Sequence, residues 1–205
     1  MTAFRRGLPW SVAWPYPRSD AVIRLARRRL MLAAAGVLVV PAHAVAVCRP
    51  TPRDALGPFY KSGAPAVAEL CAAAGKGAQR LTVTGRVIGL SDCRPLSDAR
   101  IEVWQADAQG DYTMVGGTRD DPRCLLRATL TSDREGRYQY STLLPGEYPG
   151  RPRHIHYRVT HANYAELVTQ LYFDGGRGIA PPLTSTLKRD GDNWVAVFDI
   201  TLSRR

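Results

Sequence analysis

The stretch Pro145-Gly-Glu-Tyr-Pro-Gly-Arg-Pro-Arg-His-Ile-His-Tyr-Arg-Val159 begins as a turn-rich loop and continues as an alternating segment typical of a β-strand. Side chains on a strand point alternately to opposite faces, so His154 and His156 share one face and Ile155 and Tyr157 share the other. Two imidazoles held at a fixed separation by a strand suit a metal ion. The same spacing is also typical of the polar side of a half-exposed strand, so other residues must decide between the two readings.

Short apolar segments rich in Val, Ile, Thr and Tyr alternate with Gly, Asp and Pro from residue 81 onward. This pattern indicates seven strands, which are Leu81–Leu90, Ala99–Ala106, Leu125–Ser132, Arg137–Leu143, His154–Thr160, Leu167–Phe173 and Trp194–Leu202. Short strands joined by turns such as Asp133–Gly136 predict an all-β fold, an antiparallel β-sandwich. Its loops 107–124 and 174–193 are long for a sandwich, and we expect them to be active-site loops.

The first 46 residues have the pattern of an export signal. The basic residues Arg27–Arg29 precede an apolar run, residues 30–40, and small residues follow at Ala42, Ala44 and Ala46. The apolar run is shorter than the roughly 20 residues that span a bilayer, so no stable membrane span is expected. The adjacent arginines suggest the twin-arginine route to the periplasm or the exterior. A cytosolic protein with a disordered basic tail is the alternative.

Without that leader, which includes a disordered extension before Arg24, the chain is far less basic. Seven of the 28 Lys and Arg and one of the 18 Asp and Glu lie in residues 1–46, which leaves 21 basic against 17 acidic residues. Residues 47–205 contain no basic run interleaved with aromatic residues, so nucleic acid is not indicated as a partner. They are numerous enough for one domain with its own core.

Four cysteines follow the predicted leader, namely Cys48, Cys71, Cys93 and Cys124. An even number in an exported protein favours disulfides, and four cysteines allow three connectivities. We favour a bridge between Cys93 and Cys124. A lipid anchor on Cys48 is the alternative there, although Val47 before it is bulky for such a cleavage site.

Several motifs occur in a fixed order between residues 50 and 175. They are Gly57-Pro-Phe-Tyr60, Gly63-Ala-Pro65, Cys93-Arg-Pro-Leu96, Ile101-Glu-Val-Trp-Gln-Ala-Asp107, Gly110-Asp-Tyr112, Asp133-Arg-Glu-Gly-Arg-Tyr138, Arg151-Pro-Arg-His-Ile-His156 and Thr169-Gln-Leu-Tyr-Phe173. The ordered set resembles the intradiol ring-cleavage dioxygenases, non-haem ferric enzymes that open catechols between the two hydroxyls. The catalytic core of that family is a β-sandwich, in agreement with the strand pattern.

The resemblance implies one Fe(III) ion held by four side chains, Tyr112, Tyr148, His154 and His156. Ferric iron is a hard ion that favours anionic oxygen, which a phenolate supplies. Because a free tyrosine has a pKa of about 10, the bound metal must hold the phenolate form. Tyr138, Tyr140, Tyr157, Tyr164 and Tyr172 are expected to be packing or surface residues.

The resemblance also assigns the surroundings of the metal. It implies that Arg151 stabilises negative charge that develops on the substrate and that Gln170 lies near the iron. Gly57 and Pro58 are expected to line the substrate side of the pocket, whereas Trp104 and Asp107 are structural.

The implied reaction inserts both atoms of O2 into a catechol and yields a cis,cis-muconate-type diacid. The substrate displaces Tyr148 and a hydroxide, and these two bases accept its protons. The motifs do not single out one catechol, and the arginines that could bind a substrate carboxylate are Arg119, Arg123, Arg153 and Arg177. The sequence gives no indication of oligomeric state.

Two other functions stay open. One is a secreted, non-catalytic β-sandwich binding module that keeps the family fold. The other is a zinc hydrolase built on His154 and His156, for which the sequence shows no third ligand at a recognisable spacing.

Overall fold

The computed structural model describes residues 48–72, 79–112, 124–173 and 178–205. The predicted export signal, the middle of the first long loop and the start of the second lie outside the described residues. No helix in the described ranges is long and apolar enough to cross a membrane.

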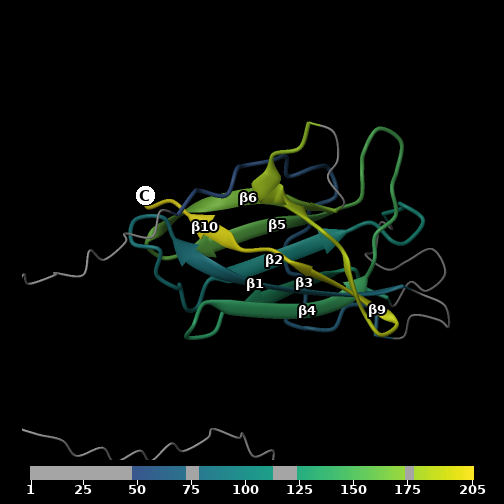
Figure 1. The fold of residues 1–205 in the computed structure, drawn as a ribbon, viewed down its shortest axis with the longest axis horizontal. Coiled ribbons are helices and arrows are strands. Elements are labelled where there is room, and N and C mark those ends of the chain that lie inside the picture. The colour runs from purple at the N-terminus through teal and green to yellow at the C-terminus, as the bar shows by residue number, and fades with distance from the viewer. Residues whose placement is uncertain (1–47, 73–78, 113–123, 174–177) are drawn as a thin grey trace, which may run out of the picture. The chain divides into compact units, whose positions relative to one another are not determined.

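The described residues form two sheets of five strands each (Figure 1). In one sheet the paired strands follow the order β10-β1-β9-β8, and β4 also pairs with β1. It contains β1 (Arg80–Gly89), β4 (Arg137–Leu143), β8 (Lys188–Asp190), β9 (Asn193–Val197) and β10 (Ile200–Leu202). The other sheet has the order β3-β2-β5-β6-β7 and contains β2 (Arg100–Gln105), β3 (Arg127–Thr131), β5 (His154–His161), β6 (Tyr164–Phe173) and β7 (Thr184–Ser185). A 3-10 turn, η1 (Pro181–Leu183), precedes β7. The predicted all-β sandwich is confirmed.

The sheets are mixed and not purely antiparallel as predicted, although most of the strand pairs are antiparallel. β1 pairs in parallel with both β9 and β10, and β6 pairs in parallel with β7. The single strand predicted over residues 194–202 is two strands, because the chain crosses Gly85 of β1 at Phe198. A Cβ on Gly85 would lie only 1.9 Å from the carbonyl oxygen of Phe198, so glycine permits this crossing.

The core lies between the sheets and follows the two-residue period of the strands. On β1 the buried residues Leu81, Val83 and Val87 alternate with partly exposed ones, and on β5 the residues Ile155, Tyr157 and Val159 are buried. Three predicted packing tyrosines, Tyr138, Tyr140 and Tyr157, belong to this core. Burial raises the pKa of all three phenols well above the ordinary value.

The opposite face of the second sheet carries polar and aromatic residues in register. Trp104 on β2, His156 on β5 and Gln170 on β6 are direct neighbours across the strands, and His154 pairs with Tyr172. We call this side the outer face.

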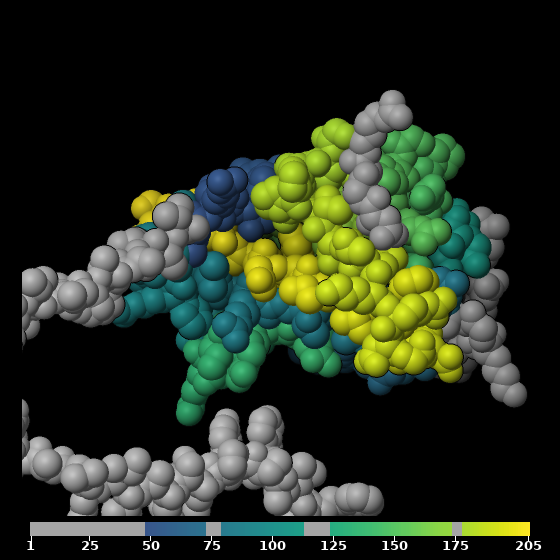
Figure 2. Space-filling model, viewed as in Figure 1, coloured from purple at the N-terminus to yellow at the C-terminus, as the bar shows by residue number. Residues whose placement is uncertain are grey.

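The N-terminal strap, residues 51–65, is bonded to this sheet. The backbone N–H of Thr129 donates to the Pro65 carbonyl at 2.8 Å, and the Gln170 amide donates to the Ala55 carbonyl at 2.7 Å. The start of the strap is tied to β10 by two bonds between Thr51 and Thr201, and Figure 2 shows these first described residues (dark blue) against the C-terminal strands (yellow). The polar outer face is therefore covered on one side by the chain itself.

The predicted bridge between Cys93 and Cys124 is wrong. The structure pairs Cys48 with Cys93 and Cys71 with Cys124. The path of the N-terminal segment is the reason, since Leu70 donates its N–H to the Ser141 carbonyl at 2.8 Å and so brings Cys71 beside the start of β3 and the end of β4. Because the sulfur of Cys48 is in a disulfide, it is not available to carry a lipid.

We predict that replacing Cys71 and Cys124 together with serine lowers the free energy of unfolding by about 4 kcal/mol. The bridge closes a 53-residue separation, and a loop of that length restricts the unfolded chain by about that amount. Urea denaturation of the double variant measures the change, with the Cys48→Ser/Cys93→Ser pair, of similar separation, as a comparison. An unchanged midpoint with an unchanged slope contradicts the assigned pairing.

Candidate metal centre

Three predicted site residues converge at one end of the outer face. The Nε2 atoms of His154 and His156 lie 3.2 Å apart, and the Tyr148 hydroxyl lies 3.2 Å from Nε2 of His154. Both histidines are only 2% exposed. Tyr148 reaches them because two backbone hydrogen bonds between Tyr148 and Arg151 fold the loop back before β5. The loop and the strand quoted at the outset therefore form one cluster.

Tyr112 lies beside the same cluster. Its ring centroid is 6.1 Å from that of Tyr148 and 6.4 Å from that of His156. Its hydroxyl is buried and forms no well-shaped hydrogen bond with any described residue. Burial, followed by the neighbouring Tyr148, raises the pKa of the Tyr112 phenol. A buried polar atom without a partner is costly, and a cation at this point would relieve that cost by binding the phenolate.

His154 is oriented with a lone pair towards the cluster. Nδ1 of His154 lies 2.7 Å from the Pro152 carbonyl, which can only accept, so Nδ1 carries the proton and Nε2 is left free to bind. His156 stacks on Trp104 at a centroid distance of 5.0 Å with nearly parallel planes. Burial lowers the pKa of His154, and burial together with His154 lowers the pKa of His156 to about 3. Both rings are therefore neutral near pH 7, as metal ligation requires.

Gly57 and its neighbours border the cluster on the strap. Gly57 has a φ of +72°, a conformation that favours glycine. A Cβ at this position would lie 3.0 Å from Cε1 of His156, so the strap can approach the ring closely because Gly57 has no side chain. Phe59 stacks on Tyr112 at 4.1 Å and is 41% exposed. Pro58 lies between these two residues on the strap. The segment predicted to line the substrate side thus lies next to the predicted ligands.

Arg151 and Gln170 meet beside the histidines. Nη2 of Arg151 donates to the side-chain oxygen of Gln170 and, at 3.2 Å, to the Tyr172 hydroxyl. The sequence did not predict a role for Tyr172 at the site. Its ring centroid lies 5.6 Å from that of His154. The two-residue spacing from Gln170 on the same strand is the signal that could have placed it on the outer face.

Other predicted residues fall outside this group. Asp107 accepts from the backbone N–H groups of Gln109 and Asp111, so it shapes the turn that leads to Tyr112. Arg153 is half-buried, and its buried Nε forms no hydrogen bond with any described residue. Arg119, Arg123 and Arg177 lie outside the described residues.

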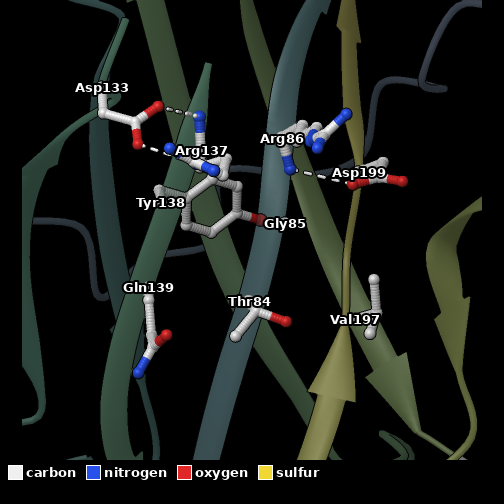
Figure 3. A pocket seen from close by; sticks show the side chains of 9 residues that line it. All are labelled: Thr84, Gly85, Arg86, Asp133, Arg137, Tyr138, Gln139, Val197 and Asp199. Carbon is white, nitrogen blue, oxygen red and sulfur yellow. Dashed lines mark hydrogen bonds and ion pairs between the residues drawn. The ribbon is translucent and has the colours of Figure 1, made fainter. Parts of the chain in front are cut away.

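The described ranges contain no group of three or more His, Cys, Asp or Glu side chains placed to share a metal. The further side-chain donors next to the two histidines are therefore the phenols. A separate groove lies on the exposed side of the other sheet, around Gly85 of β1 (Figure 3). It shares no residue with the cluster, and its charged side chains pair locally, as Arg137 does with Asp133 at 2.9 Å.

The fold and the cluster together define a class, an all-β sandwich with two phenols and two imidazoles on the outer face of one sheet. Comparison with known proteins gives the family, because the model of the family described as Dioxygenase matches residues 56–203. The chain belongs to the intradiol ring-cleavage dioxygenases.

Individual relatives agree with this assignment. The chain is 27% identical over 175 residues to a chlorocatechol 1,2-dioxygenase of Pseudomonas sp. (strain P51), covering 72% of this chain and 68% of the relative. It is 35% identical over 135 residues to the protocatechuate 3,4-dioxygenase beta chain of Burkholderia cepacia, covering 60% and 57%. Several relatives are thus matched over little more than half their length.

A solved structure matches over its whole length. It is the dioxygenase domain of a dioxygenase carbohydrate-binding protein fusion from Streptomyces sp. SirexAA-E, with 32% identity and a TM-score of 0.67. The alignment covers 77% of this chain and 100% of that domain.

We predict that Gly57→Ala disturbs the cluster, whereas Gly63→Ala does not. Both glycines have a positive φ, so each alanine should cost about 1 kcal/mol of stability, but only at Gly57 does the new Cβ meet His156. The ring resonances of His156 in NMR spectra should shift in the first variant alone. Equal shifts in both variants, or in neither, contradict the close approach.

We predict that the metal-free protein loses stability as the pH falls from about 6.5 to about 3. Unfolded histidine takes up a proton near pH 6.5, whereas folded His156 stays neutral down to about 3, so acid favours the unfolded state across that window. One such proton gives a slope of about 1.4 kcal/mol per pH unit at most. His156→Gln should flatten the profile, and His161→Gln, on the same strand, should leave it unchanged. A profile of equal steepness in all three proteins contradicts the lowered pKa.

Proposed function

We propose that this chain is a non-haem ferric intradiol dioxygenase that inserts both atoms of O2 into a catechol-type aromatic diol and yields a cis,cis-muconate-type diacid. The observation that carries the proposal is the convergence of Tyr148, His154 and His156 around a point that Tyr112 also borders, with a buried hydroxyl that forms no well-shaped hydrogen bond. The names of the relatives support the substrate class, since catechol, chlorocatechol and protocatechuate are all aromatic vicinal diols.

The donor set fits a ferric ion. Two phenols and two neutral imidazoles supply hard, partly anionic ligation, and Tyr112, Tyr148, His154 and His156 would hold the metal. When bound, ferric iron supplies the electron-withdrawing centre that makes a catecholate reactive towards O2. The Pro152 carbonyl and the Trp104 ring fix the planes of the two histidines.

Tyr148 and the residues next to the four ligands act on the substrate. Tyr148 lies on a loop rather than on a strand, so its phenolate oxygen can turn away and accept a proton from a substrate hydroxyl. Gln170 and Tyr172 hold the guanidinium of Arg151 in place. Its positive charge would stabilise the negative charge that develops on the substrate ring. Phe59 and the absent side chain of Gly57 leave a flat, apolar border suited to an aromatic ring.

The export of the protein remains part of the proposal. Every cysteine in the described residues is in a disulfide, which supports a destination in an oxidising compartment. Residues 1–46 would be the signal, and residues 47–205 the working domain.

We predict a broad visible absorption band from the chain reconstituted with ferric iron, because a tyrosinate bound to Fe(III) transfers charge to the metal. Anaerobic addition of catechol should shift the band as a catecholate replaces one phenolate. A protein that stays colourless after reconstitution would instead favour a non-catalytic binding module.

We predict that Tyr148→Phe lowers kcat/KM for catechol at least 100-fold while the melting temperature stays within about 2 °C. The variant removes a proton acceptor, an effect of 10²- to 10⁴-fold in other enzymes, but it keeps the ring. Tyr164→Phe, a buried tyrosine on β6, is the matched control and should keep near-full turnover. Parallel loss of turnover and melting temperature at Tyr148 counts against the ligand role.

A further inference from the structure

Asp54 on the strap reaches the outer face and contacts Tyr172. One carboxylate oxygen, Oδ2, lies 2.8 Å from the Tyr172 hydroxyl, and the other, Oδ1, accepts from the Ala55 N–H at 2.6 Å. The backbone N–H of Asp54 donates to the Val168 carbonyl at 3.0 Å, which fastens this part of the strap to β6. The carboxylate is therefore held at both oxygens and from its own backbone.

The direction of the hydrogen bonds around Tyr172 follows from their chemistry. The Gln170 amide nitrogen donates to the Ala55 carbonyl at 2.7 Å, so the Gln170 oxygen faces Arg151 and Tyr172. The Tyr172 hydroxyl has one proton and two acceptors at 2.8 Å, Oδ2 of Asp54 and the side-chain oxygen of Gln170. The ionised carboxylate is the stronger acceptor, so the proton is directed to Asp54. With the proton directed to Asp54, the oxygen of Tyr172 is left to accept from Arg151 at 3.2 Å.

We propose that Asp54 is a positioning residue for Arg151, acting through Tyr172. The carboxylate fixes the rotation of the Tyr172 hydroxyl, and the hydroxyl and the Gln170 oxygen together hold Nη2 of Arg151 in one place. The proposal rests on the proposed function for the catalytic importance of Arg151, but the hydrogen-bond relay itself does not.

The Asp54 carboxylate also brings a negative charge close to Arg151. The carboxylate lies one hydroxyl away from the guanidinium, so it offsets part of the positive charge of Arg151. The strap thus supplies a negative charge at Asp54 and also covers part of the outer face.

Asparagine at position 54 tests this arrangement without removing bulk. Two hydrogen bonds arrive at the two oxygens of Asp54, whereas an asparagine side chain has only one acceptor oxygen. Asp54→Asn must therefore lose one of them or direct an N–H group at Tyr172. Tyr172→Phe breaks the same relay from the other side and keeps the ring.

The first measurement is NMR of the Arg151 guanidinium in the full chain, metal-free and loaded with gallium(III), a diamagnetic trivalent substitute for ferric iron. Held Nη–H groups rotate and exchange slowly and give resolved signals, which Arg151→Lys assigns. We expect resolved signals in the wild type and in the controls Asp190→Asn and Tyr164→Phe. We expect averaged signals in Asp54→Asn and Tyr172→Phe.

The second measurement is turnover of the iron-loaded protein with catechol. We expect each single variant to lower kcat about tenfold with KM changed less than twofold, because charge on the substrate develops in the transition state. The double variant should lose no more than the larger single variant, since both act through one relay.

The two measurements separate this proposal from the proposed function. Averaged Arg151 signals in both relay variants support the relay even in a protein without dioxygenase activity. Resolved signals in Asp54→Asn and Tyr172→Phe overturn it even if the enzyme is active. Additive losses in the double variant also overturn it, because they show that Asp54 does not act through Tyr172.

Discussion

The pairing of β5 with β2 and β6 is the constraint on which the rest of the structure depends. A strand has two faces, and the register sends Ile155, Tyr157 and Val159 into the core while it sends His154 and His156 out. A slip of one residue would exchange these two sets and would bury both imidazoles among apolar side chains. The apolar core therefore fixes the site, because the free energy of burying one face holds the other face in place.

Much of the fold could be predicted because its signals are local. The two-residue alternation and the turn residues mark β1 to β6, and the spacing of His154 and His156 places both rings on one face. The parallel pairing of β1 with β9 and β10 could not be predicted in this way. It depends on a contact between Gly85 and Phe198, two residues that are far apart in the sequence. The disulfide partners were missed for the same reason, because they follow the path of the strap.

The candidate site likewise contains residues that could be predicted from the sequence and residues that could not. The order of the motifs indicated Tyr112, Tyr148, Arg151 and Gln170 through resemblance, and the structure brings them together with the two histidines. Tyr172 and Asp54 carry no motif of their own. Their parts follow only from a segment that crosses the outer face and brings a carboxylate within 2.8 Å of a hydroxyl on a distant strand.

The two disulfides give the strap a covalent attachment that a segment outside the two sheets usually lacks. Such segments ordinarily fray, because little besides hydrogen bonds retains them. Here one bridge holds the chain just before the strap, at Cys48, and the other holds it just after, at Cys71. Gly57, Phe59 and Asp54 therefore belong to a covalently closed loop, and they remain beside the outer face even when individual hydrogen bonds open. Reduction of both bridges would leave the strap attached by hydrogen bonds alone, such as the bond from the Asp54 N–H to the Val168 carbonyl.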